Sequence, residues 1–283
     1  MNPVVAVIAP GMMGAAVGRR LVDHGVKVLT SLEGRSAETK ERAKVAGMAA
    51  VGDDEIATSD FILSILPPGD AVALAQRFVP ALTASNSKPV YVDCNAVSPP
   101  TVERIAAAIA PTGSPFVDAG IIGSPPKPND AGPRFYASGP QAHRFAKLKE
   151  HGLDVRVLDG PMTAASALKM SYAGITKGTT AIASAMLLGA ARFGCGEALI
   201  AELTESQPEM LARFREGIPR MYDKAYRWVA EMEEISDFLS GNPPSRDIYA
   251  AIARLYADLA EAEAEKEPGP DNAVRALARV LGR

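Results

Sequence analysis

From the N-terminus to about residue 158, short apolar runs alternate with amphipathic helical patterns. The apolar runs are Val4–Ile8, Val26–Thr30, Phe61–Leu66, Val90–Asp93, Phe116–Ala119, Phe135–Ser138 and Val155–Leu158. Helical patterns lie between several of them, at about 12–23, 37–46, 70–82, 99–110 and 140–149. Strands that are apolar throughout and separated by helices predict βαβ units and a mostly parallel sheet covered on both faces.

The pattern changes after Gly160-Pro161. From Thr163 to Arg283 only helical periodicity is present, interrupted at Gly194–Gly196, Gly241–Pro244 and Pro268–Pro270. The sequence therefore predicts an α/β domain over residues 1–160, with a doubly wound sheet, and an all-α domain over residues 161–283.

Composition and charge exclude several classes of protein. The chain has 283 residues, 47% apolar and 22% charged, which suits a folded protein large enough for two domains. Its net charge of −3 gives no basic footprint for nucleic acid. The two cysteines, Cys94 and Cys195, and the three histidines show no metal-ligand spacing, so we expect no metal site.

The same composition bears on location. The longest uncharged helical stretch, Gly178 to Ala191, is shorter than the roughly 20 residues that a membrane span needs. No basic segment precedes the first apolar run, as it would in a signal peptide. We expect a cytoplasmic protein, and two unclustered cysteines fit a reducing compartment.

The first apolar run leads into the loop Ala9-Pro10-Gly11-Met12-Met13-Gly14, and a helical pattern begins at once. This is a G-x-G-x-x-G site with Ala9 in place of the first glycine. Gly11 would admit a pyrophosphate and Gly14 would allow close packing of helix on strand, while the helix N-terminus offers free amides. We interpret the loop as a phosphate loop and the domain as a Rossmann-type dinucleotide-binding domain.

The end of the second apolar run bears on the choice of nicotinamide cofactor. Four polar residues lie there, Ser31, Glu33, Arg35 and Ser36. An arginine with serine neighbours suits the 2′-phosphate of NADP, whereas Glu33 would accept the free 2′-hydroxyl of NAD. We expect NADP; the alternative is that Glu33 selects NAD and Arg35 is a solvated loop residue.

Four segments together resemble the β-hydroxyacid dehydrogenase superfamily, which includes 6-phosphogluconate and 3-hydroxyisobutyrate dehydrogenases, and in particular a branch with a C-terminal domain of unknown function. They are the phosphate loop, Ser64-Ile65-Leu66-Pro67, Asp93 through Pro99, and Gly160 through Gly178. The resemblance implies that Leu66, Pro67 and Asn95 lie at the cofactor. It also implies a homodimer or larger oligomer held by the C-terminal helices.

The last of these segments contains Lys169, in a helix otherwise made of apolar and small residues. Tyr172, Ala173, Thr176 and Lys177 follow it at spacings that share one helix face. The resemblance implies that Lys169 is the catalytic lysine, and Tyr172 is a second catalytic candidate. The alternative is a lysine whose head reaches water.

The chain departs from the family pattern at the substrate. Ala173 stands where the family usually has an asparagine, and Ile122 replaces a serine that commonly holds the substrate carboxylate. A carboxylate buried without donors is costly, so we expect small hydroxy acids to be poor substrates. The residues expected around the substrate are Gly120, Ile122, Gly123, Ser124, Ala173, Thr176 and Lys177.

These patterns predict an NADP-dependent oxidoreductase that moves hydride between the nicotinamide and an alcohol or carbonyl carbon. Two alternatives stay open, an imine reductase on the same scaffold and a non-catalytic NADP-binding sensor. The retained Lys169 argues against both.

Overall fold

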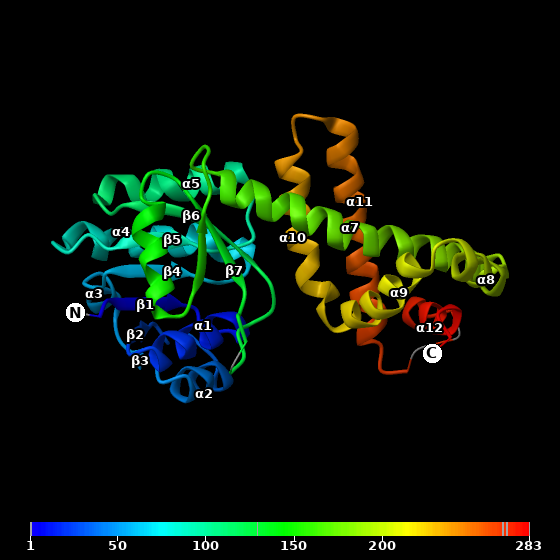
Figure 1. The fold of residues 1–283 in the computed structure, drawn as a ribbon, viewed down its shortest axis with the longest axis horizontal. Coiled ribbons are helices and arrows are strands. Elements are labelled where there is room, and N and C mark those ends of the chain that lie inside the picture. The colour runs from blue at the N-terminus through cyan, green and yellow to red at the C-terminus, as the bar shows by residue number, and fades with distance from the viewer. Residues whose placement is uncertain (1, 129, 268, 270, 283) are drawn as a thin grey trace. The chain divides into compact units, whose positions relative to one another are not determined.

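The computed structural model describes residues 2–128, 130–267, 269 and 271–282. The chain divides into two compact units, Met1–Met170 and Ser171–Arg283, and the division falls within helix α7, Ala164–Arg192. The ribbon in Figure 1 runs from the blue strands of the first unit to the red helix near the end of the second.

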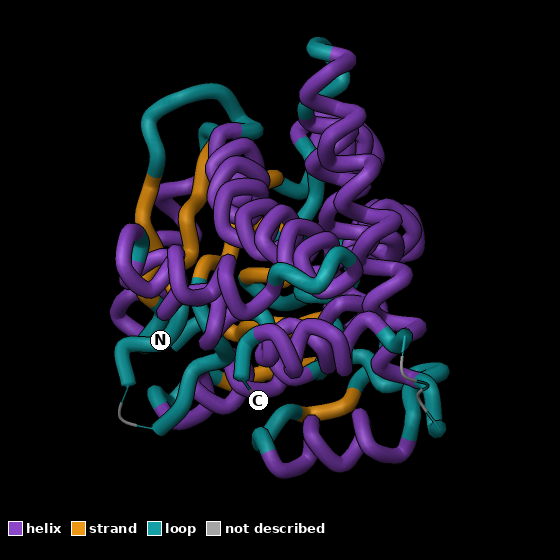
Figure 2. The backbone as a smooth tube through the Cα atoms, turned by 90° about the vertical axis from the view of Figure 1, so that its right-hand side faces the viewer, coloured by secondary structure: helices purple, strands orange, loops and turns teal. Residues whose placement is uncertain are grey.

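The first unit is built on one sheet of eight strands in the order β3-β2-β1-β4-β5-β6-β7-β8. All neighbouring strands are parallel except β6 and β7, which are antiparallel. Figure 2 shows the strands in orange. Their bounds are β1 Val4–Ile8, β2 Lys27–Thr30, β3 Ala49–Ala50, β4 Phe61–Ser64, β5 Val90–Asp93, β6 Phe116–Ile122, β7 Arg134–Ser138 and β8 Asp154–Val157.

Helices cover both faces of this sheet and enclose two hydrophobic cores. One core joins β1, β4 and β5 to α1 and α6 through residues such as Val7, Leu21 and Phe145; the other joins the same strands to α4 and α5 through Ile62, Phe78 and Ile105. The helices of this unit are α1 Met12–Asp23, α2 Ala37–Val45, α3 Asp53–Ile56, α4 Ala71–Ala84, α5 Pro99–Ile109 and α6 Ala142–Phe145, with short 3-10 segments at Pro68–Asp70, Ala110–Thr112 and Ala146–His151.

This architecture confirms the predicted fold class of a doubly wound, mostly parallel sheet followed by helices. Three local predictions differ from the structure. The two-residue strand β3 gave no apolar run in the sequence, and β6 extends to Ile122 because it pairs with the antiparallel β7. The helix expected at 140–149 is α-helical only to Phe145 and continues as a 3-10 segment.

A row of buried polar residues crosses the sheet near the carboxyl ends of its central strands. Ser64 on β4, Asp93 on β5, Asp118 on β6 and Ser138 on β7 are successive partners in the strand register, and each is fully buried. Directly paired residues point to the same face of a sheet. Two carboxyl groups therefore lie side by side in the interior.

The two carboxyl groups have different surroundings. Asp118 accepts hydrogen bonds from the backbone N–H of Ser166 at 2.8 Å, the Ser166 hydroxyl at 2.6 Å and the Ser138 hydroxyl at 3.3 Å. Asp93 accepts a hydrogen bond from the Asn95 amide, but its second carboxyl oxygen, Oδ2, has no partner among the described residues. Burial, and then the charge of Asp118, raise the pKa of Asp93 to about 8. Burial also raises the pKa of Asp118, to about 6.

The described residues of the second unit form helices joined by turns and loops, with no strand among them. It holds the rest of α7, then α8 Gly196–Ser206, α9 Pro208–Gly217, a 3-10 segment Pro219–Lys224, α10 Ala225–Phe238, α11 Pro243–Ala264 and α12 Ala273–Val280. α10 and α11 pack side by side, and Lys177 of α7 contacts both of them, through Glu231 of α10 and Tyr256 of α11 (Figure 1). Gly174 and Gly178 leave room for the Tyr249 ring, and the Tyr256 hydroxyl donates to the carbonyl of Lys177 at 2.6 Å.

We expect the stability of the fold to fall as pH rises from about 4 to about 8, because Asp93 binds its proton more tightly folded than unfolded. The ordinary carboxyl pKa is 3.8 and the pKa of Asp93 in the fold is about 8, so the stabilising proton is fully present below the first value and is lost as pH rises through the second. The slope from one such group is at most about 1.4 kcal/mol per pH unit. Asp93→Asn should flatten the pH dependence of urea unfolding between pH 5 and 8.

Asp54→Asn makes the same change of charge at an exposed position of α3 and is the matched control. It should keep the wild-type slope. Equal slopes in Asp93→Asn and the wild type would mean that Asp93 is ionised in the folded chain at neutral pH.

Candidate active site

The phosphate loop has the geometry that a dinucleotide requires. After β1, the backbone turns tightly, with the N–H of Gly11 donating to the carbonyl of Ala9 at 2.9 Å, and α1 begins at Met12. A Cβ on Gly14 would lie 2.0 Å from the Ala9 carbonyl oxygen, so only glycine allows α1 to approach the loop this closely.

Gly11 is different, because a Cβ added there would meet no atom within 4 Å. The space over Gly11 is therefore open, next to the first amides of α1 and the 60% exposed side chain of Met12. Ala9 and Pro10 are buried beneath the loop and Met13 is half-buried. An open glycine at a helix N-terminus fits a pyrophosphate, which backbone N–H groups and the helix dipole would hold.

The end of β2 presents the four residues expected to distinguish the cofactors. Arg35 is half-buried, and its guanidinium has no hydrogen bond or ion pair with any residue in the described part of the chain. Ser36 caps α2, since its hydroxyl accepts from the N–H of Thr39 at 3.2 Å. Glu33 is exposed and Ser31 is buried. Both candidate groups are therefore accessible, the Arg35 guanidinium for a 2′-phosphate and the Glu33 carboxylate for a 2′-hydroxyl.

Two further arginines reach this region and were not singled out from the sequence. Arg77, from α4, binds Asp53 through two hydrogen bonds and donates to the Ser31 hydroxyl. Arg42, from α2, donates to the Pro10 carbonyl at 3.3 Å. Each lies more than 30 positions from the loop residue that it contacts, so no local spacing in the sequence indicated the contact.

Asn95 ties two strand ends together. Its amide donates to the Ser64 hydroxyl at 2.7 Å and to Asp93, and its carbonyl accepts from the N–H of Leu66 at 2.7 Å. Asn95 is buried, so these bonds use most of the hydrogen-bonding capacity of its side chain. It fixes the segment Leu66-Pro67 that follows β4, where the resemblance places the cofactor.

Lys169 lies over Gly120 of β6. A Cβ on Gly120 would come within 2.9 Å of both the Ala165 carbonyl oxygen and the Lys169 Cβ, so α7 rests directly on this glycine. Hydrogen bonds hold the first turn of α7 in place. Ser166 donates to the Asp118 carboxylate, and the N–H of Ala165 donates to the Ser138 hydroxyl at 2.9 Å. Lys169 is half-buried, and its ammonium has no polar partner among the described residues.

The other expected substrate residues of the first unit lie at the end of β6. Ile122 is the last residue of the strand and is 9% exposed. Gly123 has a φ of 131° and approaches Pro133 closely, which excludes a side chain there. Ser124 is exposed. The strand end thus offers an apolar side chain, a turn and one exposed hydroxyl-bearing residue.

The remaining candidates belong to the α7 turns of the second unit. Tyr172 is 49% exposed, Ala173 is buried, and the Thr176 hydroxyl donates to the carbonyl of Tyr172 at 2.9 Å. Lys177 forms an ion pair with Glu231, and its ammonium lies 4.8 Å from the Trp228 ring centroid. The ammonium of Lys177 is thus engaged within the helical unit, unlike that of Lys169.

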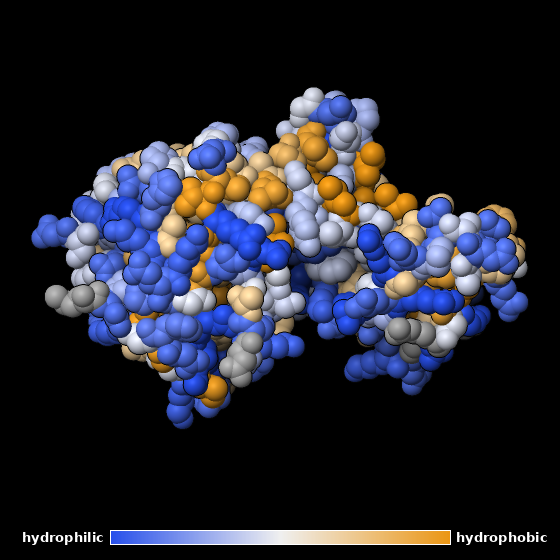
Figure 3. Space-filling model, in the orientation of Figure 1, coloured by the Kyte–Doolittle hydropathy of each residue, from blue (hydrophilic) through white to orange (hydrophobic). Residues whose placement is uncertain are grey.

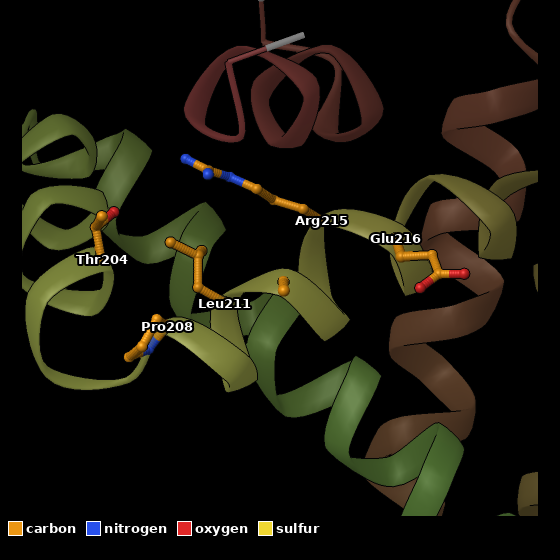
Figure 4. A pocket seen from close by; sticks show the side chains of 6 residues that line it. Thr204, Pro208, Leu211, Arg215 and Glu216 are labelled. Carbon is orange, nitrogen blue, oxygen red and sulfur yellow. The ribbon is translucent and has the colours of Figure 1, made fainter.

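A hollow of about 380 Å³ between α8 and α9 is lined by residues from both helices, including Leu211 and Arg215 (Figure 4). None of the expected site residues lines it. Within the described part of the chain, no group of three or more His, Cys, Asp or Glu side chains could hold a metal ion. Nor does any described helix have the length and apolar character of a membrane span.

Comparison with known proteins places the chain in a family. The family model for the NAD binding domain of 6-phosphogluconate dehydrogenase matches residues 4–151, and a domain of unknown function, DUF1932, matches residues 190–259. An uncharacterised 28.5 kDa protein of Methanothermus fervidus is 30% identical over 184 residues, which cover 64% of this chain and 69% of that protein.

Solved structures agree with the family models. A conserved protein of unknown function, described as structurally similar to 3-hydroxyacid dehydrogenases, is 31% identical with a TM-score of 0.70, covering 91% of this chain and 96% of that one. The 3-hydroxyisobutyrate dehydrogenase of Mycobacterium tuberculosis, solved with L-serine, shares the fold at 16% identity and a TM-score of 0.74, covering 98% and 99%.

An imine reductase of Myxococcus stipitatus in complex with NADP+ also shares the fold, at 18% identity and a TM-score of 0.59, covering 99% of this chain and 100% of that one. The phosphate loop and the topology of the sheet are consistent with the family models that match this chain. The chain belongs to the β-hydroxyacid dehydrogenase superfamily, with the NAD-binding domain of 6-phosphogluconate dehydrogenase followed by a DUF1932 region.

Proposed function

We propose that this chain is an NADP-dependent oxidoreductase that interconverts an alcohol and a carbonyl group in a small molecule, with Lys169 as the acid/base. The observation that carries the proposal is the placing of Lys169, half-buried over Gly120, with an ammonium that no described side chain neutralises. The ammonium of Lys177, in contrast, is paired with Glu231.

The residues of the first unit divide the work. The amides at the start of α1, over the open Gly11, would bind the pyrophosphate, and Arg35 would bind the 2′-phosphate of the adenosine ribose. Asn95 holds Leu66-Pro67 in position for the nicotinamide side. When bound, the nicotinamide supplies or accepts the hydride. In reduction Lys169 gives a proton to the oxygen of the carbonyl as its carbon is reduced, and in oxidation it takes that proton from the alcohol.

The substrate class follows from the departures at Ile122 and Ala173. Both are apolar and buried, where the resemblance places polar contacts to a hydroxy acid. We infer a substrate with apolar bulk near the reacting carbon, whose reacting oxygen contacts Lys169. Tyr172, Thr176, Gly123 and Ser124 remain candidate site residues from the resemblance, and Lys177 is one only if its pair with Glu231 opens.

An imine reductase is the second candidate, since a reductase of that class that binds NADP+ shares the fold over nearly the whole chain. A non-catalytic NADP sensor is the third. Both would leave Lys169 without a role in proton transfer to oxygen, which is why we rank them below the alcohol and carbonyl reaction.

We also propose a homodimer formed through the helical unit, and a cytoplasmic location in keeping with two free cysteines. Three apolar residues of α7, Ile175, Ile182 and Met186, and Phe193 directly after its end recur at intervals of 7, 4 and 7 and are 56% to 83% exposed. This spacing places the three helical residues on one face of α7, as in a coiled-coil seam. Figure 3 shows hydrophobic surface gathered in orange along α7 and the neighbouring parts of α10 and α11.

The cofactor proposal predicts that NADPH binds at least about ten times more tightly than NADH, because a charge-assisted pair with phosphate exceeds the roughly 1.4 kcal/mol that this ratio requires. Calorimetric titration of Arg35→Ala should show most of the preference lost and NADH binding nearly unchanged. A wild-type chain that prefers NADH would assign the selection to Glu33.

The catalytic proposal predicts that Lys169→Ala keeps NADPH affinity within about threefold and lowers kcat by about a hundredfold or more. The assay follows NADPH absorbance with the best substrate from a panel of ketones, aldehydes and imines. Tyr172→Phe should show a smaller loss of kcat. Lys149→Ala, an exposed lysine of the first unit, is the control.

Three outcomes would change the proposal. Wild-type turnover by Lys169→Ala would make the lysine structural. Turnover of imines alone would favour the second candidate, and tight NADPH binding with no turnover in the whole panel would favour the sensor.

The dimer proposal predicts that light scattering at micromolar concentration gives a molar mass of twice the 29.7 kDa of one chain. The double variant Ile182→Glu with Met186→Glu should scatter as a monomer, because it puts charges into the apolar face. Ala201→Glu, at an exposed position of α8, should leave the mass unchanged. A wild-type mass of one chain would exclude the dimer.

A further inference from the structure

We infer that Arg77 is a specificity-determining residue of the cofactor site, which offsets the negative charge at the end of β2 and thereby admits a nucleotide with a 2′-phosphate. This inference rests on the proposed cofactor function. It concerns a residue of α4, far in the sequence from the phosphate loop and from the β2 end.

Arg77 is held firmly. Its Nε donates to Asp53 Oδ2 at 2.8 Å and its Nη2 to Asp53 Oδ1 at 2.7 Å, a bidentate pair in which the side chains are 32% and 23% exposed. The same Nη2 donates to the Ser31 hydroxyl at 2.7 Å. A planar guanidinium with bonds in these directions has little freedom to turn.

The bond to Ser31 places the guanidinium at the part of the sheet that matters for cofactor choice. Ser31 directly follows β2, and in dinucleotide-binding folds the end of this strand reads the 2′ position of the adenosine ribose. Arg77 thus reaches, from 46 positions away, the same strand end that carries Glu33 and Arg35.

The charges at this strand end explain what Arg77 does there. Glu33 and Asp53 are both acidic, and the Nη2 of Arg77 lies 2.7 Å from an oxygen of Asp53 and 3.5 Å from one of Glu33. With Arg77 these three groups sum to −1; without it they sum to −2. A phosphate monoester itself carries about −1.5 to −2 at neutral pH, so the extra negative charge would repel it.

A role confined to stability is the competing explanation, because the Arg77–Asp53 pair also links α4 to α3. The two dinucleotides separate these explanations. NADPH and NADH differ only in the 2′-phosphate, so damage to the fold weakens both, whereas a change of charge at the β2 end alters the ratio of their affinities.

The experiment measures the Kd of NADPH and of NADH by calorimetry at low salt for the whole chain and its variants. Arg77→Gln should lower the NADPH-to-NADH affinity ratio by about fivefold. Asp53→Asn, which leaves Arg77 uncompensated, should raise the ratio above that of the wild type. The double variant Arg77→Gln with Asp53→Asn restores the local sum to −1 and should return the ratio to within about twofold of the wild type.

The matched control is Arg156→Gln. Arg156 also binds an aspartate, Asp154, through two hydrogen bonds, but on β8 at the opposite edge of the sheet. This variant makes the same change of net charge and should leave the ratio within about twofold. If Arg77→Gln alone does not fold, the test still stands on two variants. Asp53→Asn should have a higher NADPH-to-NADH affinity ratio than the wild type, and the double variant should have a ratio close to the wild type.

If every variant binds both dinucleotides with the same NADPH-to-NADH affinity ratio as the wild type, the role of Arg77 is overturned and the proposed function still stands. An equal shift in Arg156→Gln would also overturn it, since net charge would then be the cause. A wild-type chain that binds neither dinucleotide would overturn the proposed function and this inference with it.

Discussion

The start of α7 depends on the hydrogen bonds that the Asp118 carboxylate accepts. Asp118 is the third of four residues in a buried polar row on the sheet and accepts from the N–H and the hydroxyl of Ser166, in the first turn of α7. These bonds satisfy a helix terminus that would otherwise leave amides unpaired in the interior. They also place α7 on Gly120, where a side chain of any kind would push the helix away. The position of Lys169 is therefore fixed by a neighbouring strand as much as by its own helix.

The phosphate loop depends on a comparable constraint of space. Gly14 is packed so closely against the Ala9 carbonyl that no side chain fits, while Gly11, three residues earlier, faces open space. Gly14 allows α1 to pack on the sheet, and Gly11 would leave room for a ligand. In a doubly wound sheet such a loop and the ends of β2, β4 and β5 meet at one edge, which is why ligands bind there.

Membership of the superfamily explains the scaffold but leaves the specificity to individual residues. Ile122 and Ala173 are apolar where the resemblance leads one to expect polar side chains. At the cofactor end, arginines from two helices converge on the loops after β1 and β2, Arg42 on Pro10 and Arg77 on Ser31. The fold, and not proximity along the chain, brings these charges to the ends of β1 and β2, where we propose that the cofactor binds.

The sequence by itself determined the parts that local physics controls. Alternation of apolar runs with amphipathic helices indicated the strands of the first unit and its fold class, because burial on both faces of a parallel sheet requires continuous apolar strands. The sequence also predicted the phosphate loop, because its turn and the start of its helix depend on neighbouring residues in the chain. β3, with two exposed alanines, lacked the apolar signal altogether. Only the tertiary structure decided that Asn95 ties β4 to β5, that Lys177 pairs with Glu231 while Lys169 has no polar partner among the described residues, and that Arg77 reaches Ser31. Each of these depends on which strands and helices become neighbours, and that order is set by packing across the whole unit and not by the spacing of residues along the chain.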